Sequence, residues 1–245
     1  MCGRFFIGQP PEVYRTVYGY SERPNFPGRY NIAPTQPVPV VLTEQGKRQF
    51  RLVRWGLWPT WLKDPNGFPV LFNARIESAG EKPAFRGALR HRRCIFLADG
   101  FYEWRREGTG KGSGKGAVKQ PFAVRRTDGA PMALAGLWEP WGGADGSEVD
   151  TAAIVTCSAN GTLSAIHERM PAILSPEAVD AWLDPRVDGP EAAQLCRPYP
   201  DAWLRLDAVS ERVNGTRHDD PDLIEPVGRA RAAPAPRAAV QGELF

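Results

Sequence analysis

Cys2 is the residue of this chain best suited to covalent chemistry. The initiator methionine is normally removed when a small residue follows it, and Cys2 would then present an α-amine and a thiol on neighbouring carbon atoms. At neutral pH an α-amino group is uncharged far more often than a lysine side chain, so this amine is the available nucleophile for an aldehyde. The thiol can then add to the Schiff-base carbon and close a thiazolidine ring. The aminothiol therefore predicts an aldehyde target, and the alternative is a cysteine that merely lies in a frayed terminus.

Several short motifs accompany the segment MCGRF at residues 1–5. They are GRYNIAPTQ at 28–36, WGLWPTW at 55–61, FNARIES at 72–78, ADGFYEW at 98–104, IHERMP at 166–171 and VSERVNGTRHDDPDLIEPV at 209–227. Together they resemble the SRAP family, the SOS response-associated peptidases or abasic site processing proteins, from Cys2 to about Val227. The resemblance implies that Cys2, once self-processing has removed Met1, forms a covalent crosslink with the ring-opened sugar of an abasic site in single-stranded DNA. Such a protein shields the lesion and has peptidase-like and lyase-type activity, but it is not a general protease.

The resemblance assigns catalytic roles to Asn73, Glu103 and His167 beside the cysteine. The amide of Asn73 can hold the terminal amine or a sugar hydroxyl, although alone it reads as a strand-end turn former. Aromatic neighbours would desolvate Glu103 and suit it to general acid-base catalysis; its alternative is an ion-paired strand residue beside Arg75 or Arg105. His167 could assist sugar ring opening and crosslink reversal, whereas alone it reads as a capping or core histidine.

Single-stranded DNA is held by aromatic stacking platforms next to a basic groove. The resemblance assigns stacking to Trp61 and Trp104, phosphate contacts to Arg4, Arg75 and Arg86, and a place on the DNA-facing surface to Pro34 and Thr156. Leu62 stands where some relatives carry a second aromatic residue, which predicts weaker splaying of the strands at a lesion. Residues 75–106 contain eight lysines and arginines against four acidic residues, although a solvated surface is the alternative interpretation of this basic stripe.

Composition narrows the class of protein. The chain has 245 residues, of which 42% are hydrophobic and 24% are charged, and this is typical of globular proteins. It shows no long apolar run and no signal peptide, so membrane and secreted classes are not expected. The four cysteines lie far apart and form no C-x-x-C pair, so neither disulfides nor a metal site is expected. We expect a monomer without cofactors in a bacterial cytoplasm, associated with the nucleoid.

Prolines and glycines divide the chain into short apolar segments, so strands should dominate with helices interspersed. Strands are expected at 38–42, 93–98, 121–124, 132–137 and 152–156. Helices are expected at 11–18, 83–89, 160–166, at 176–183 with Ser175 as N-cap, and around 191–195. No regular alternation of strands and helices argues for a doubly wound sheet. The expected fold is α+β, with mainly antiparallel strands in one barrel-like core and peripheral helices, a shape that comes from the family resemblance.

Two segments should lie outside the packed core of the predicted domain, which spans residues 2–227. The Gly/Lys-rich segment Glu107–Gln120 should be a mobile loop that connects paired strands. Residues 228–245 form a tail rich in alanine, proline and arginine, which should be disordered. Its end, Gln241-Gly242-Glu243-Leu244-Phe245, resembles peptides that bind the bacterial sliding clamp. Gln241, Leu244 and Phe245 therefore predict a tether to that partner, against the alternative of a frayed terminus.

Two other functions remain open from the sequence. Glutamine amidotransferase domains also begin Met-Cys-Gly and use a terminal cysteine against an amide, so an N-terminal-nucleophile amidohydrolase is one alternative. Arg4 and the later motifs argue against it, and glutamine hydrolysis that depends on Cys2 would support it. The other alternative is a non-covalent single-stranded DNA-binding module. Mass spectrometry after mixing with abasic DNA separates that module from a crosslinking protein.

Overall fold

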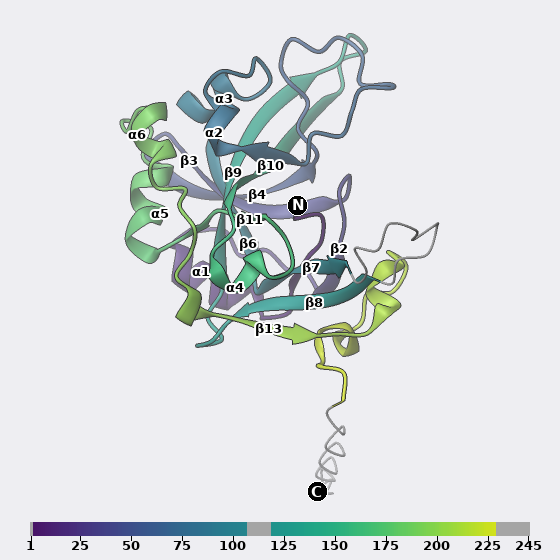
Figure 1. The fold of residues 1–245 in the computed structure, drawn as a ribbon. Coiled ribbons are helices and arrows are strands. Elements are labelled where there is room, and N and C mark those ends of the chain that lie inside the picture. Colours follow the sequence, from purple (N-terminus) through teal and green to yellow (C-terminus); the bar gives the residue numbers. More distant parts are fainter. Residues whose placement is uncertain (1, 107–118, 229–245) are drawn as a thin grey trace, which may run out of the picture.

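The computed structural model describes residues 2–106 and 119–228 of the chain (Figure 1). Its strands are β1 (Phe5–Ile7), β2 (Arg29–Ile32), β3 (Pro37–Glu44), β4 (Lys47–Trp55), β5 (Asn73–Arg75), β6 (Arg93–Ala98), β7 (Gly100–Arg106), β8 (Lys119–Arg126), β9 (Met132–Gly142), β10 (Glu148–Ser158), β11 (Arg169–Pro171), β12 (Ile173–Leu174) and β13 (Leu204–Ala208). Its helices are α1 (Pro11–Tyr18), α2 (Ile76–Ala79), α3 (Arg86–His91), α4 (Gly161–Ser164), α5 (Pro176–Leu183), α6 (Gly189–Ala193) and the 3₁₀-helices η1 (Asp201–Trp203), η2 (Glu211–Asn214) and η3 (Pro221–Ile224).

Five strands close into a ring. The order is β10-β4-β3-β6-β9, and β9 pairs with β10 again to complete the circle. Four of these pairings are antiparallel, and only β4 and β10 run parallel. The short strands β5, β11 and β12 attach to β10 and β9. A second, antiparallel sheet has the order β13-β8-β7-β1-β2. The predicted α+β fold with a barrel-like core is therefore confirmed.

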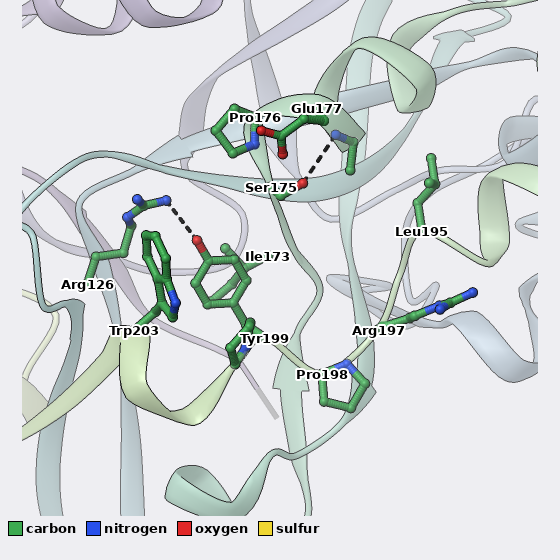
Figure 2. Close-up of a pocket in the computed structure, with 12 residues that line it drawn as sticks. Arg126, Ile173, Ser175, Pro176, Glu177, Leu195, Arg197, Pro198, Tyr199 and Trp203 are labelled. Atoms are coloured by element: carbon green, nitrogen blue, oxygen red, sulfur yellow. Dashed lines mark hydrogen bonds between the residues drawn. The ribbon is translucent and has the colours of Figure 1, made fainter.

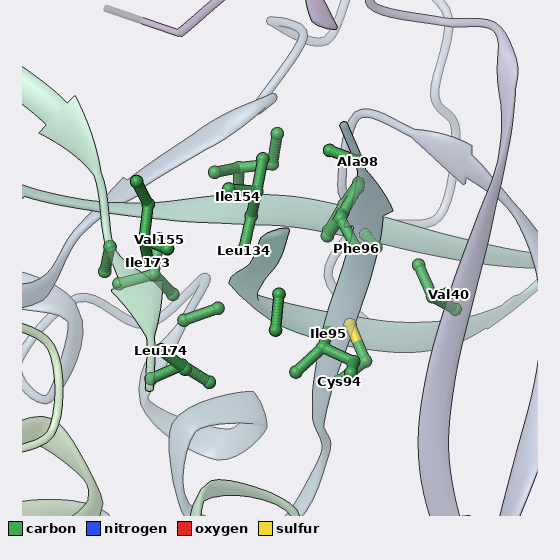
Figure 3. Packing of buried hydrophobic residues seen from close by; sticks show 14 of the residues in the cluster. Val40, Cys94, Ile95, Phe96, Ala98, Leu134, Ile154, Val155, Ile173 and Leu174 are labelled. Carbon is green, nitrogen blue, oxygen red and sulfur yellow. The ribbon is translucent and has the colours of Figure 1, made fainter. Parts of the chain in front are cut away.

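The interior of the barrel is filled by apolar side chains from all of its walls (Figure 3). A glycine in β9 leaves room for side chains of the neighbouring strand β6. A Cβ atom at Gly136 would lie 2.6 Å from the Phe96 ring and 2.8 Å from Cys94 Sγ, so any larger residue would force the packing apart. The space that Gly136 leaves empty is thus filled by side chains of the neighbouring strand β6.

Phe5 joins the second sheet to the barrel. Its ring lies edge-on to Trp55 of β4 at 5.1 Å and to Phe96 of β6 at 6.2 Å, measured between ring centroids. All three side chains are fully buried. Because aromatic edge-to-face packing adds to the stabilisation that burial gives, this cluster anchors β1 against the barrel. The residues just before β1 are thereby brought to the junction between the two sheets.

Helices pack around the sheets, as predicted. In α1 a proline stands at the first turn, and Gly19 ends the helix with a φ of 68° while its N–H donates to Arg15 O. Ser175 caps α5 by accepting from Ala178 N. Figure 1 shows α3, α5 and α6 together on one side of the barrel. Within the described ranges, none of the helices is both long and apolar enough to span a membrane.

The hairpin β7–β8 bears on the predicted Gly/Lys-rich loop. Arg106 at the end of β7 pairs with Lys119 at the start of β8, so the paired strands expected on either side of this loop are present, with the second beginning at Lys119. The loop residues 107–118 lie outside the described residues. The predicted tail from 229 onwards, including the clamp-binding motif at Gln241, Leu244 and Phe245, lies outside them as well.

Candidate active site

Cys2 lies buried at the junction of the two sheets. It precedes β1, and the pairing of β1 with β7 continues beyond Phe5 because Tyr102 N donates to Arg4 O at 2.9 Å. The side chain has 0% exposure, and its Sγ lies 4.0 Å from Arg4 O. Burial raises the pKa of the Cys2 thiol well above its usual range, and the negative charge of Glu103 raises it further. The thiol is therefore protonated at neutral pH.

Asn73 contacts Cys2 from the other sheet. It begins β5, which runs parallel to β10 with Asn73 opposite Ile154. Its Nδ2 donates to Cys2 O at 2.9 Å. Its Oδ1 is buried and accepts no hydrogen bond within the described residues. A buried amide oxygen without a hydrogen-bond donor is energetically costly, so Oδ1 favours the binding of a group that can donate to it.

Glu103 reaches the same place from β7. It lies opposite Phe122 in β8, and only 4% of the residue is exposed. Its negative charge is one of the causes that raise the pKa of the Cys2 thiol. The hairpin β7–β8 thus supplies a buried carboxyl group that acts electrostatically on the cysteine, and β5 supplies the amide that contacts it.

His167 is held in one orientation by backbone hydrogen bonds. It follows α4, which Asn160 caps by accepting from Leu163 N, and His167 N donates to Leu163 O at 2.9 Å. The ring nitrogen Nδ1 accepts from Arg169 N, also at 2.9 Å. A nitrogen that accepts carries no proton, so the neutral imidazole has its proton on Nε2. The half-buried His167 ring therefore carries its proton on Nε2.

Arg169 was not singled out from the sequence, and it braces this region. Its guanidinium forms a bidentate pair with Glu77 of α2 at 2.6 and 2.8 Å and donates to Thr156 O of β10 at 2.8 Å. The bidentate pair holds the pKa of the Glu77 carboxyl below its usual value, mainly through the hydrogen bonds from Arg169. Since Arg169 follows His167 in the IHERMP motif, its place in that motif was the available signal.

The residues expected to contact DNA differ in exposure. Trp61 is 56% exposed in the connection between β4 and β5, with its ring edge-on to Phe68 at 6.1 Å. Arg75 and Arg86 are exposed. Glu77, the acidic residue two positions after Arg75, is paired with Arg169. These positions are available to a ligand.

Four other expected contacts are at least partly engaged within the fold. Trp104 is half-buried and donates from Nε1 to Asn214 Oδ1 at 2.8 Å, and Pro34 is half-buried after β2. Thr156 has 0% exposure, and its Oγ1 accepts from Arg169 at 3.3 Å. A direct contact between Thr156 and DNA would need neighbouring chain to move. The guanidinium of Arg4 donates to Asn31 Oδ1 and Val213 O, each at 2.7 Å.

A separate pocket of about 450 Å³ lies by the N-terminus of α5 (Figure 2). Trp203 and Tyr199 line it, and Arg126 donates to the Tyr199 hydroxyl at 2.8 Å. None of the residues that the sequence assigned to catalysis or DNA binding lines this pocket. In the part of the chain that the structure describes, no group of three or more His, Cys, Asp and Glu residues could hold a metal ion.

Comparisons with known proteins give a consistent result. A family model described as SOS response associated peptidase (SRAP) matches residues 1–216. The abasic site processing protein YedK of Escherichia coli (strain K12) is 33% identical across 93% of this chain and 100% of its own. YoqW of Bacillus subtilis (strain 168), which has the same description, is 33% identical across 92% and 99%. A crystal structure from Bacteroides thetaiotaomicron shares the fold, with a TM-score of 0.79 and 23% identity over 92% of this chain and 99% of that one.

Proposed function

Because this chain belongs to the SOS response associated peptidase (SRAP) family, we propose that it processes abasic sites in single-stranded DNA by a covalent bond to Cys2. The relatives YedK and YoqW are named abasic site processing proteins. An abasic sugar in its open form carries an aldehyde, which is the group that a terminal aminothiol captures. In this proposal the protein first loses Met1, then crosslinks to the lesion and shields it.

The contact between Asn73 and Cys2 carries the proposal. Nδ2 of the amide holds the Cys2 carbonyl at 2.9 Å, while Oδ1 is buried and takes no donor within the described residues. The α-amino group of Cys2 is attached to the carbon next to that carbonyl, so its nitrogen is three bonds from the oxygen that Asn73 holds. A terminal amine would supply the missing donor, so Asn73 can fix the nucleophile by both of its ends.

The protonated state of the thiol favours an order of events. Since burial raises its pKa, the thiol is a poor first nucleophile, and the amine attacks the aldehyde carbon first. Loss of water gives the Schiff base. The sulfur then bonds to that carbon, and its proton passes to the Schiff-base nitrogen, which closes the thiazolidine. In this proposal Glu103, whose charge acts on the pKa of the thiol, carries this proton.

In this proposal His167 and Glu103 each carry out one of the two proton transfers that open the sugar ring. Opening breaks the bond between C1 and the ring oxygen, which then needs a proton, while the C1 hydroxyl loses one to become the aldehyde. The Nε2 proton of His167 suits the first transfer because Arg169 N occupies Nδ1. The Glu103 carboxylate suits the second transfer. Reversal of the crosslink breaks the C–S bond of the thiazolidine, returns a proton to the sulfur and then adds water to the Schiff base. The same two groups can carry these protons, and the products are the abasic sugar and an intact Cys2 terminus.

Glu103→Gln tests the acid-base role. Glutamine keeps the shape but carries no titrating proton, so crosslinking should slow by about 10²-fold, the usual scale for a positioned acid-base group. Single-turnover formation of the denaturant-resistant adduct on an abasic oligonucleotide measures the rate. Glu139→Gln is the matched control, because Glu139 of β9 is also 4% exposed but pairs with Arg92, which ends α3. Equal rates in the Glu103 variant and the wild type would return Glu103 to a structural role.

The exposed Arg75 and Trp61 provide a test of the DNA track. Arg75→Ala should lower the magnitude of the salt dependence of single-strand binding by about 0.7 for one lost phosphate contact. Trp61→Ala should leave that slope nearly unchanged and weaken binding by about 1–3 kcal/mol if a base stacks there. Titrations at several salt concentrations measure both effects. Arg186→Ala and Trp203→Ala are the controls, since these exposed residues lie outside the proposed track; effects as large in the controls would contradict it.

A further inference from the structure

Residues 2–4 need support from outside the strands. They precede β1, and a chain terminus frays unless its neighbours hold it. Two backbone oxygens are held, Cys2 O by Asn73 and Arg4 O by Tyr102 N. The side chain of Arg4 supplies the remaining link, because its Nη1 donates to both Asn31 Oδ1 and Val213 O at 2.7 Å. This side chain therefore ties the nucleophile's strand to a segment more than two hundred residues later.

Asn31 is the centre of this link. It has 1% exposure, and its Oδ1 accepts from Arg4. Its Nδ2 lies within hydrogen-bond distance of three carbonyl oxygens, at 3.2 Å from Val213, 3.1 Å from Gly215 and 2.8 Å from His218. One buried amide thus gathers residues 213–218, which we term the clasp, around the guanidinium of Arg4. Burial of so many polar groups is stable only while all of them are hydrogen-bonded, so the arrangement is specific.

The clasp also contacts the strand that carries Glu103. Asn214 Oδ1 accepts from Trp104 Nε1 at 2.8 Å, and Trp104 follows Glu103 directly in β7. Arg4 Nη2 adds a longer contact to Asn214 O at 3.4 Å. The clasp therefore contacts Arg4, which is near Cys2, and Trp104, which is next to Glu103. It can thus fix Cys2 and Glu103 relative to each other.

We propose that Asn31 is a positioning residue, which holds Cys2 in line for attack by locking Arg4 onto the clasp. The role rests on the proposed crosslinking function for its catalytic consequence, and Asn31 itself touches no reacting atom. In this view Arg4 acts mainly within the protein and not on a DNA phosphate. A small displacement of a reacting group can slow a reaction by up to about 10²-fold, so the loss of such a lock should be visible in the rate.

Two variants of the full-length protein test the proposal. Asn31→Ala removes the centre of the link and leaves the charge of Arg4 in place. Arg4→Lys keeps the charge, but lysine is shorter and has no second terminal nitrogen for Asn214 O, so the link to the clasp is weakened. This variant serves if Asn31→Ala does not fold. At saturating abasic single-stranded DNA we expect both variants to crosslink at least about 10-fold more slowly. Their affinity for intact single-stranded DNA should stay within about 3-fold of wild type, and the double variant should be no slower than the slower single variant.

Hydrogen–deuterium exchange of residues 2–9 gives a readout that does not depend on crosslinking. Exchange there should quicken by about 10-fold or more in both variants, while the barrel strands β6 and β9 stay protected. Arg93→Lys is the matched control, because Arg93 is also buried and donates to several carbonyl oxygens, in its case near α3 and α5. This variant should change neither the crosslinking rate nor the exchange of residues 2–9. Wild-type exchange at residues 2–9 in both variants overturns the positioning role. A wild-type protein that forms no adduct overturns the proposed function instead, and exchange still decides the role of Asn31.

Discussion

Cys2→Ala should abolish the denaturant-resistant adduct with abasic single-stranded DNA. The variant keeps the terminal amine after Met1 is removed, so a Schiff base can still form, but no sulfur remains to close the ring. Reversible hydrolysis then returns the aldehyde, and no stable product accumulates. Non-covalent affinity for single-stranded DNA should stay within a few-fold, since that affinity comes mainly from phosphate and stacking contacts of other residues. Denaturing gel electrophoresis and the mass of the N-terminal peptide measure the adduct.

A second product should distinguish the loss of sulfur from the loss of the amine. A Schiff base that is not trapped leaves the open sugar prone to β-elimination, so Cys2→Ala should nick the strand that the wild type protects. Cys196→Ala is the matched control, because that thiol is also buried and its pKa is likewise raised by burial. It should crosslink at the wild-type rate. A stable adduct in Cys2→Ala, or its loss in Cys196→Ala, contradicts the mechanism.

Elements with strong local signals could be predicted closely from the sequence. Helices α1 and α5 and strand β6 have the predicted bounds. In α1 a proline at the start and Gly19 at the end fix the helix, and in α5 Ser175 and Pro176 fix its first turn. The strands β1 and β5 were not predicted, because each has three residues and exists only through partners far away in the chain. Such pairing leaves no periodic pattern within the strand itself.

In the candidate site, too, the sequence could name residues but could not predict the contacts between distant segments. The sequence could name Cys2, Asn73 and Glu103, but their separation along the chain gave no information on distance. Two missed strands, β1 and β5, place the first two in contact. The sequence also could not foresee that the guanidinium of Arg4 would be occupied within the protein, because its partner Val213 lies in the C-terminal segment. Motif membership identifies a residue as important, and only packing distinguishes a contact with DNA from a link inside the fold.

The proposed chemistry also requires that Cys2 be the first residue. An N-terminal extension that blocks removal of Met1 should eliminate crosslinking. In the extended chain the Cys2 nitrogen becomes part of a peptide bond, and delocalisation of its lone pair into the carbonyl group removes its nucleophilicity. The thiol alone, protonated because burial raises its pKa, cannot form a lasting adduct with the aldehyde. A fusion placed directly before Met1 provides this block, and intact mass confirms that it remains uncleaved.

Rescue makes the test of the terminal amine decisive. A second fusion carries a protease site whose cleavage leaves Cys2 as the new terminus, and treatment with that protease should restore crosslinking to the wild-type rate. The same tag at the other end of the chain is the control and should have no effect on the rate. Thermal unfolding should be nearly unchanged in all fusions, because the buried ring of Phe5 anchors β1. Equal crosslinking by the uncleaved fusion would show that the amine is not the nucleophile, and the contact of Asn73 with Cys2 would then be purely structural.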